Sequence, residues 1–137
     1  QPGDVRVGLR SRGRTLGDRD PSVGTALLFA GWCRSRLGEP EAGARDVSEG
    51  LALRRQTFGD RHWAVAAARS MLGDVLSHVA GRDDDALREL RLGYDGLRAT
   101  LDPGNARVRQ AGIRLRNYYQ ARGRPAEARR VADSLGA

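Results

Sequence analysis

The sequence has a single cysteine, Cys33, and no lysine, so all 24 of its basic residues are arginine. One thiol cannot form an internal disulfide, which excludes a small secreted domain held together by disulfides. No segment is apolar for 18 consecutive residues, and the N-terminus lacks the apolar stretch of a signal peptide. We therefore expect no membrane contact from this segment and a cytoplasmic location, unless a larger parent protein is anchored in a membrane.

Aromatic residues are also scarce, at 5% of the chain, whereas 39% of it is hydrophobic and 30% is charged. This composition is typical of a globular protein and not of a disordered one. The length of 137 residues corresponds to one domain. Because few large rings are available, small aliphatic side chains must fill the core, which favours closely spaced helices.

A repeat of 42 or 43 residues runs through the chain. The segment 16–23, Leu-Gly-Asp-Arg-Asp-Pro-Ser-Val, returns at 58–65 and more weakly at 101–108. The same period separates three glycines, which are Gly38, Gly81 and Gly123. Such periodicity is typical of proteins built from stacked repeats. The predicted units are the tail helix of a preceding repeat at 1–15 and three repeats at 16–57, 58–100 and 101–137.

Each period contains two stretches with the spacing of an amphipathic helix. In the second repeat, apolar residues at steps of three and four run from Val65 to Val79, and a second stripe runs from Leu87 to Leu97. The acidic residues 83–85 are expected to supply the N-cap of that second helix and carboxylates at the positive end of its dipole. No stretch shows sustained strand alternation, so the sequence predicts an all-α protein with about seven helices.

Two helices per 42 residues, with a glycine in the turn, resemble the tetratricopeptide repeat. The segment 51–65, Leu-Ala-Leu-Arg-Arg-Gln-Thr-Phe-Gly-Asp-Arg-His-Trp-Ala-Val, is similar to the variety in kinesin light chains and bacterial regulators, where a Leu- and Arg-rich helix precedes Leu-Gly-x-x-His-Pro-x-Val. The resemblance implies an α-solenoid of antiparallel helix pairs in a right-handed superhelix. It also implies a non-catalytic protein-interaction scaffold, cut from a larger bacterial signalling protein such as a serine/threonine kinase, although no kinase motif is present.

The family's groove residues are only partly retained. Paired asparagines, which hold a bound peptide in the family, are replaced by Leu28 and Phe29 in the first repeat and by Ser70 and Met71 in the second. On the family register, the expected groove residues are Leu28, Phe29, Trp32, Arg36, Met71, Asp74, His78, Gln110, Arg114 and Asn117. The alternative that Leu28 and Phe29 belong to the interhelical core is equally open. Such a groove would suit a peptide with a hydrophobic anchor and with acidic residues paired to Arg114 and Arg36.

The residues that usually carry chemistry do not form a site in this sequence. His62, His78 and Cys33 lack the spacing of metal ligands or of a nucleophile with its base. The acidic run 83–85 lacks the alternating ligands of a calcium loop, and no glycine-rich phosphate loop occurs. We therefore expect no catalytic residue, no metal and no cofactor.

The formal net charge of +7 raises the alternative of nucleic-acid binding. Residues 101–137 hold eight arginines against three acidic residues, so the excess lies mainly in the last repeat. These arginines surround two helices and do not follow one face, and exclusive use of Arg is typical of a GC-rich genome, so nucleic acid is the less favoured partner. A third alternative is self-assembly through residues 1–15, and the oligomeric state stays open.

Overall fold

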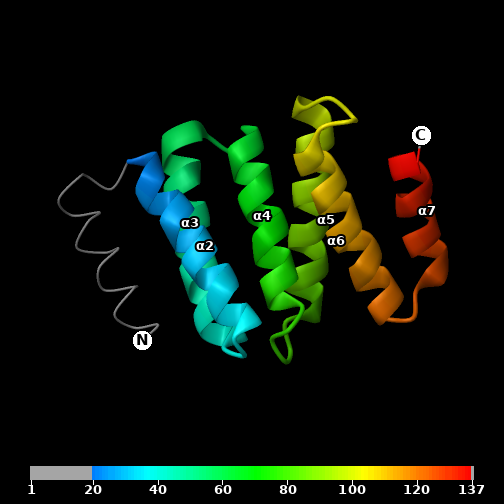
Figure 1. The fold of residues 1–137 in the computed structure, drawn as a ribbon, viewed down its shortest axis with the longest axis horizontal. Helices are drawn as coiled ribbons and strands as arrows, with labels where there is room; N and C mark the ends of the chain where they lie inside the picture. The colour runs from blue at the N-terminus through cyan, green and yellow to red at the C-terminus, as the bar shows by residue number, and fades with distance from the viewer. Residues whose placement is uncertain (1–19, 137) are drawn as a thin grey trace.

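The computed structural model describes residues 20–136, which form six α-helices and no strand (Figure 1). The helices are α2 (Pro21–Arg36), α3 (Pro40–Phe58), α4 (Trp63–Leu76), α5 (Asp83–Thr100), α6 (Ala106–Ala121) and α7 (Pro125–Gly136). This architecture confirms the expected all-α class. The helix predicted within residues 1–15 lies outside the described residues.

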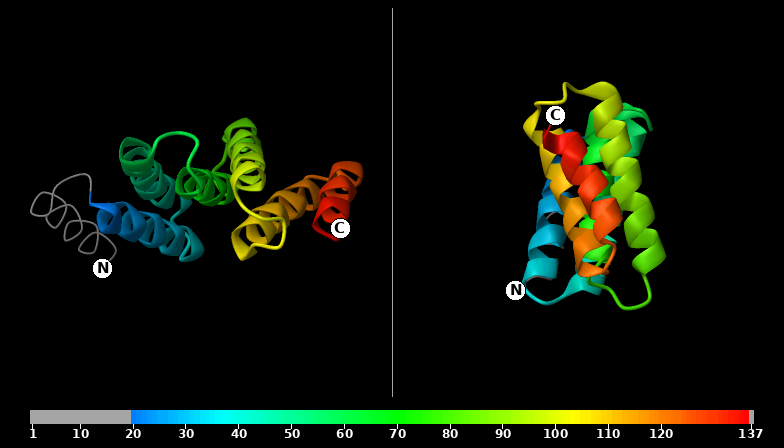
Figure 2. Two further views of the ribbon diagram at one scale, coloured as in Figure 1. Left: turned by 90° about the horizontal axis from the view of Figure 1, so that it is seen from above. Right: turned by 90° about the vertical axis from the view of Figure 1, so that its right-hand side faces the viewer.

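Consecutive helices run antiparallel and pack side by side, so the molecule is a row with α2 and α7 at opposite ends (Figures 1 and 2). The view from above shows a zigzag in which α2, α4 and α6 form one layer while α3 and α5 lie in the other (Figure 2). Helix α4 also contacts α2 and α6 directly. This stacking is an α-solenoid, in which each helix pair buries its apolar face against the next pair. The repeat boundaries between residues 57 and 58 and between residues 100 and 101 stay a prediction.

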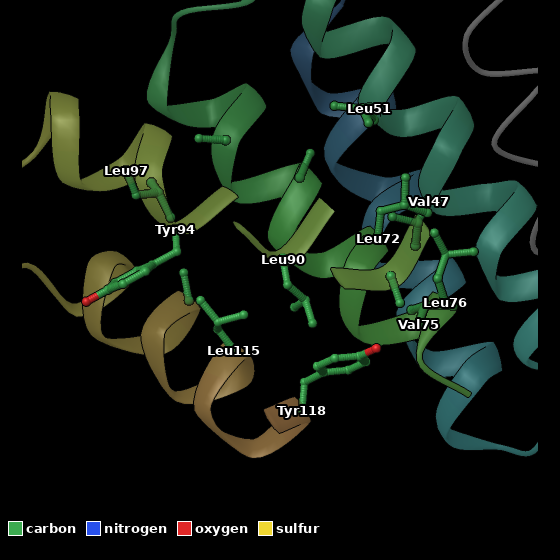
Figure 3. Close-up of a cluster of buried hydrophobic side chains, with 14 of the residues drawn as sticks. Val47, Leu51, Leu72, Val75, Leu76, Leu90, Tyr94, Leu97, Leu115 and Tyr118 are labelled. Atoms are coloured by element: carbon green, nitrogen blue, oxygen red, sulfur yellow. The ribbon is translucent and has the colours of Figure 1, made fainter. Parts of the chain in front are cut away.

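The core is a continuous row of aliphatic side chains between the two layers, with a few tyrosines (Figure 3). Val47, Val65 and Val75 are completely buried, and Leu90 and Leu97 are nearly so. Helices α2 and α3 approach so closely that a methyl group on Gly31 would lie 2.6 Å from the carbonyl oxygen of Gly43. Close packing through small residues is thus present, as the shortage of aromatic residues predicts.

The turn glycines explain why the repeat is visible in the sequence. Gly38, Gly81 and Gly123 have φ angles of +94°, +78° and +70°, a region that side chains with a Cβ rarely adopt. Each lies in the turn between the two helices of a pair. A glycine at this point is therefore a requirement of the backbone, and its period marks the period of the fold.

The helix caps differ in part from the expectation. The side chains of Asp20, His62 and Asn105 each accept a hydrogen bond from the backbone N–H two residues later and cap α2, α4 and α6. The expectation that residues 83–85 cap α5 is wrong, because Arg82 is the cap residue and makes no side-chain cap bond. The three aspartates instead occupy the first turn, where their charge still opposes the positive end of the helix dipole.

Candidate functional site

The first helix of each pair contributes to one open hollow, which we call the concave groove, of about 780 Å³. Its lining residues from α2, α4 and α6 are Thr25, Phe29, Trp32, Trp63, Ala67, Met71, Ala106, Arg107, Gln110 and Arg114. Two further residues, Arg54 of α3 and Leu97 of α5, reach it from the other layer. The layer of α2, α4 and α6 is the one that the family register assigns to the groove.

The apolar part of the concave groove is unusually rich in large side chains for a protein with few aromatic residues. Phe29 is 58% exposed, and Trp32, Trp63 and Met71 are partly buried. Trp32 is fixed at both sides, because its Nε1 donates to Asp74 at 3.2 Å and the Arg36 guanidinium lies 4.7 Å from its ring centroid. Partly exposed aromatic surface in a concavity is typical of a binding site.

The charged part of the groove consists of arginines. Arg54 donates to the Ala64 carbonyl at 2.8 Å, and Arg114 donates to Ser70 Oγ at 3.2 Å. Burial lowers the pKa of both arginines, and the negative charge of Asp74 partly opposes this effect on the pKa of Arg114. Among the described residues that line the groove, none carries a carboxylate. The groove therefore presents positive charge beside apolar surface.

A smaller hollow of about 230 Å³ adjoins the groove and shares Arg114 with it. It gathers Asp74 and His78 from the α4 side and Asn117 from α6. Arg122 of the same wall binds the carboxylate of Asp83 at 2.7 Å and also donates to the Ser77 carbonyl. These bonds join the second and third helix pairs at the lower edge of the layer.

The Arg122 guanidinium, which donates to its carboxylate, holds the pKa of Asp83 below its ordinary value. Tyr118 also donates to this carboxylate, at 3.2 Å. Burial raises the pKa of Tyr118, and the hydrogen bond to Asp83 raises it further. This edge is consequently a fixed ion pair with a neutral tyrosine, and its arginine is not free to bind a ligand.

The structure brings most of the predicted groove residues together. Phe29, Trp32, Met71, Gln110 and Arg114 line the concave groove, Asp74, His78 and Asn117 line the smaller hollow, and Arg36 stacks on Trp32. The placement of Leu28 on the groove is wrong, since it is 1% exposed and belongs to the core. A methyl group on Gly50 of α3 would meet Leu28 Cγ at 2.9 Å, so this leucine faces α3 and not the groove. Whether the nine others contact a partner stays a prediction.

Among the lining residues that the sequence did not predict, Arg54, Trp63 and Arg107 have the largest side chains. Trp63 could have been found, because it stands eight residues before Met71 and thus on the same helix face. The Arg107 guanidinium lies 4.4 Å from the centroid of the Trp63 ring, and Arg107 belongs to the arginine-rich segment 101–137. No sequence pattern places Arg54 at the groove, because it lies on the second helix of its pair and the family register assigns the groove to the first helix.

The excess of arginine in residues 101–137 is dispersed in the structure. Arg107 and Arg114 enter the groove, whereas Arg122 and Arg124 form ion pairs with Asp83 and Glu127. Within residues 20–136 no group of three or more His, Cys, Asp or Glu side chains could hold a metal ion. Nor does any helix in the described range combine the length and apolar character needed to cross a membrane.

No family model and no curated protein matches the chain. A solved structure does, with a TM-score of 0.70 and 17% sequence identity: nearly identical TPR-like repeats of a Podospora anserina protein assigned as a kinesin light chain. The match covers 93% of this chain and 60% of that structure. At this identity the likeness shows the fold alone, and it confirms a tetratricopeptide-like helical repeat. The chain spans less than two thirds of the protein it matches.

Proposed function

We propose that this chain is a non-catalytic protein-interaction scaffold whose concave groove binds a segment of a partner protein. The groove itself carries the proposal, since Phe29, Trp32 and Met71 leave apolar surface accessible beside arginines that no lining carboxylate neutralises in the described part of the chain. Stacked helical repeats generally use such a concave surface to bind other proteins. An acidic segment with an apolar anchor complements this surface in both charge and polarity.

The parent protein that we propose follows from the resemblance to tetratricopeptide repeats. We place the domain in a larger bacterial signalling protein, such as a serine/threonine kinase, in which the scaffold recruits a partner in the cytoplasm. Helical repeats of this fold are typically non-catalytic, and the groove holds no paired nucleophile and base among its described residues. The activity of any parent protein would then reside in another domain.

The test is an unbiased display library of 12-residue peptides, selected on the purified domain. We expect the selected peptides to combine Asp or Glu with a large apolar residue. Intrinsic fluorescence measures binding directly, because the two tryptophans of the chain, Trp32 and Trp63, both line the groove. Selected peptides without acidic enrichment would contradict the proposal.

The variant to compare is Trp32→Ala with Arg114→Gln, measured by calorimetry because it removes one fluorophore. We expect peptide affinity to fall at least about tenfold, as for the loss of one charged hydrogen bond. The matched control is Leu92→Ala with Arg129→Gln, which removes an exposed apolar side chain and one charge on α5 and α7, outside the groove. Circular dichroism must show that both variants are folded. Equal affinity of the two variants would refute the groove assignment.

Nucleic-acid binding through residues 107–130 is the second candidate, and the placement of the arginines gives it less support. It predicts DNA or RNA binding that weakens steeply with salt. Absence of any mobility shift at low salt would end this alternative. Self-assembly through residues 1–15 concerns a segment outside the described residues, and sedimentation over a range of concentrations tests it.

A further inference from the structure

Two arginines meet at the end of the concave groove where α4 begins. Arg54 extends from α3, and its Nη1 donates to the carbonyl of Ala64 in the first turn of α4 at 2.8 Å. Arg107 extends from the start of α6, and its guanidinium lies 4.4 Å from the centroid of the Trp63 ring. Both line the groove, so two guanidinium groups from different helix pairs face the same space.

Neither guanidinium is neutralised within the described part of the chain. The acceptors of Arg54 are the Ala64 carbonyl and the Thr25 hydroxyl, and both are uncharged. Arg107 stacks on Trp63 and forms no ion pair with a described residue. The two charges are close enough for Arg107 to lower the pKa of Arg54, in addition to the effect of burial. Like charges held together without a counter-charge favour an anion between them.

The other arginines near the groove do not share this property. Arg114 lies close enough to Asp74 for the carboxylate to raise its pKa, and Arg36 lies over Trp32 at the opposite end of α2. The Arg54–Arg107 pair lies where α4 and α6 begin.

We propose that Arg54 and Arg107 form an anion subsite that binds the phosphate group of a phosphorylated side chain on the partner segment. A phosphate monoester carries a charge of about −1.5 to −2 at neutral pH, which matches two guanidinium groups better than one carboxylate does. Its oxygens also accept the paired hydrogen bonds that guanidinium groups donate. The proposal rests on the groove being the peptide-binding surface, and it assigns a phosphorylated ligand to that surface.

The test uses each tryptophan as a separate reporter. The variant Trp32→Phe leaves only Trp63, beside the proposed subsite, and Trp63→Phe leaves only Trp32. Inorganic phosphate and O-phosphoserine are titrated at constant ionic strength, with acetate and glutamate as singly charged carboxylate controls. We expect a saturable change in Trp63 fluorescence with both phosphate compounds, at least about tenfold weaker binding of the carboxylates, and no change in Trp32 fluorescence.

The main variant is Arg107→Gln, because Arg107 is exposed and its loss removes no side-chain hydrogen bond from the described structure. We expect it to weaken phosphate binding about tenfold or more. Arg54→Gln is the second variant, and Arg129→Gln on α7 is the matched control for loss of one positive charge. O-phosphoserine binding should weaken more than sulfate binding between pH 7.5 and pH 5.5, because the second ionisation of a phosphate monoester lies near pH 6. Sulfate keeps its charge over this range, so its binding reports any contribution of His62, whose ring centroid lies 5.5 Å from that of Trp63.

Three outcomes would overturn the subsite: acetate binding as tightly as phosphate, Arg129→Gln weakening binding as much as Arg107→Gln, or a response at Trp32 in place of Trp63. If acidic peptides bind the groove but phosphate compounds do not, the subsite is wrong and the proposed function stands. If phosphate binds but no peptide does, the proposed function is wrong, and the assignment of a phosphorylated protein segment falls with it. A phosphorylated peptide binding at least tenfold tighter than its unmodified form would support both.

Discussion

The close contact between α2 and α3 predicts opposite effects of one substitution at two glycines of the same helix. A Cβ atom on Gly31 would lie 2.6 Å from the Gly43 carbonyl oxygen, 2.8 Å from Asp46 Cβ and 2.8 Å from Val47 Cγ2. On Gly24, a Cβ atom would lie 3.5 Å from its nearest neighbour, the carbonyl oxygen of Gly50, which is ordinary van der Waals contact. Both glycines are in helical backbone, so the variants Gly31→Ala and Gly24→Ala differ in packing and not in chemistry.

The expected magnitudes follow from these distances. Replacing a helical glycine by alanine stabilises a helix by about 0.5 to 1 kcal/mol, and Gly24→Ala should show this gain. At Gly31 the obstructing oxygen belongs to the backbone of α3, so the two helices must separate. Overpacking of this kind destabilises by about 1 to 3 kcal/mol, which exceeds the gain in helix propensity for most of that range.

The measurement is urea denaturation followed by circular dichroism at 222 nm. We expect the free energy of unfolding to rise for Gly24→Ala and to fall for Gly31→Ala, with a difference of about 1 to 3 kcal/mol between the variants. The double variant, with both substitutions, should show the sum of the two effects, because the sites are two turns apart and meet different residues of α3. If Gly31→Ala is as stable as Gly24→Ala, the inferred helix spacing is wrong.

Three further predictions concern single contacts. Asp83→Asn should make stability fall less steeply on acidification, because Arg122 lowers the pKa of Asp83 in the folded state. The resulting stabilisation is present above the pKa of the unfolded state and is lost as the pH falls through the pKa of the folded state. The measurement is the melting temperature of this variant and of the unmodified chain over a series of acidic pH values. Leu90→Ala should destabilise by about 2 to 5 kcal/mol, whereas Leu92→Ala, at an exposed position of the same helix, should change stability by less than about 1 kcal/mol in the same denaturation assay. Asn105→Ala should destabilise by about 1 kcal/mol and Asn105→Ser should largely restore the cap, whereas equal stability of these two variants would refute its capping role.

The sequence predicts the fold well because the features that specify it are local. Positive φ at Gly38, Gly81 and Gly123 requires glycine whatever the neighbouring sequence is, so the period survives while other positions vary. The cap positions behave differently. Asp20 and His62 both offer an acceptor to the next helix, and only the acceptor is required, so the residue type changes between repeats without loss of the fold.

The groove could be predicted only as a helix face and not as a set of residues. Leu28 and Phe29 are adjacent, yet Leu28 is 1% exposed and Phe29 is 58% exposed. The boundary between core and groove depends on where α3 lies, which Gly50 decides by allowing Leu28 to pack closely against it. Arg54 depends still more on tertiary structure, because its side chain must reach from α3 to Thr25 on α2 and Ala64 on α4.

The placement of the arginines changes the meaning of the net charge of +7. A surface for a nucleic-acid backbone requires basic side chains that share one face and remain free to contact successive phosphates. In this chain Arg122 and Arg124 are held by carboxylates at 2.7 and 2.6 Å, while Arg107 and Arg114 enter the concave groove from α6. The charge that remains unneutralised at the groove lies beside Trp63, in a space about 780 Å³ in volume. The proposed ligand, a short anionic segment with an apolar part, matches this placement, because such a ligand can contact the arginines and the aromatic rings together.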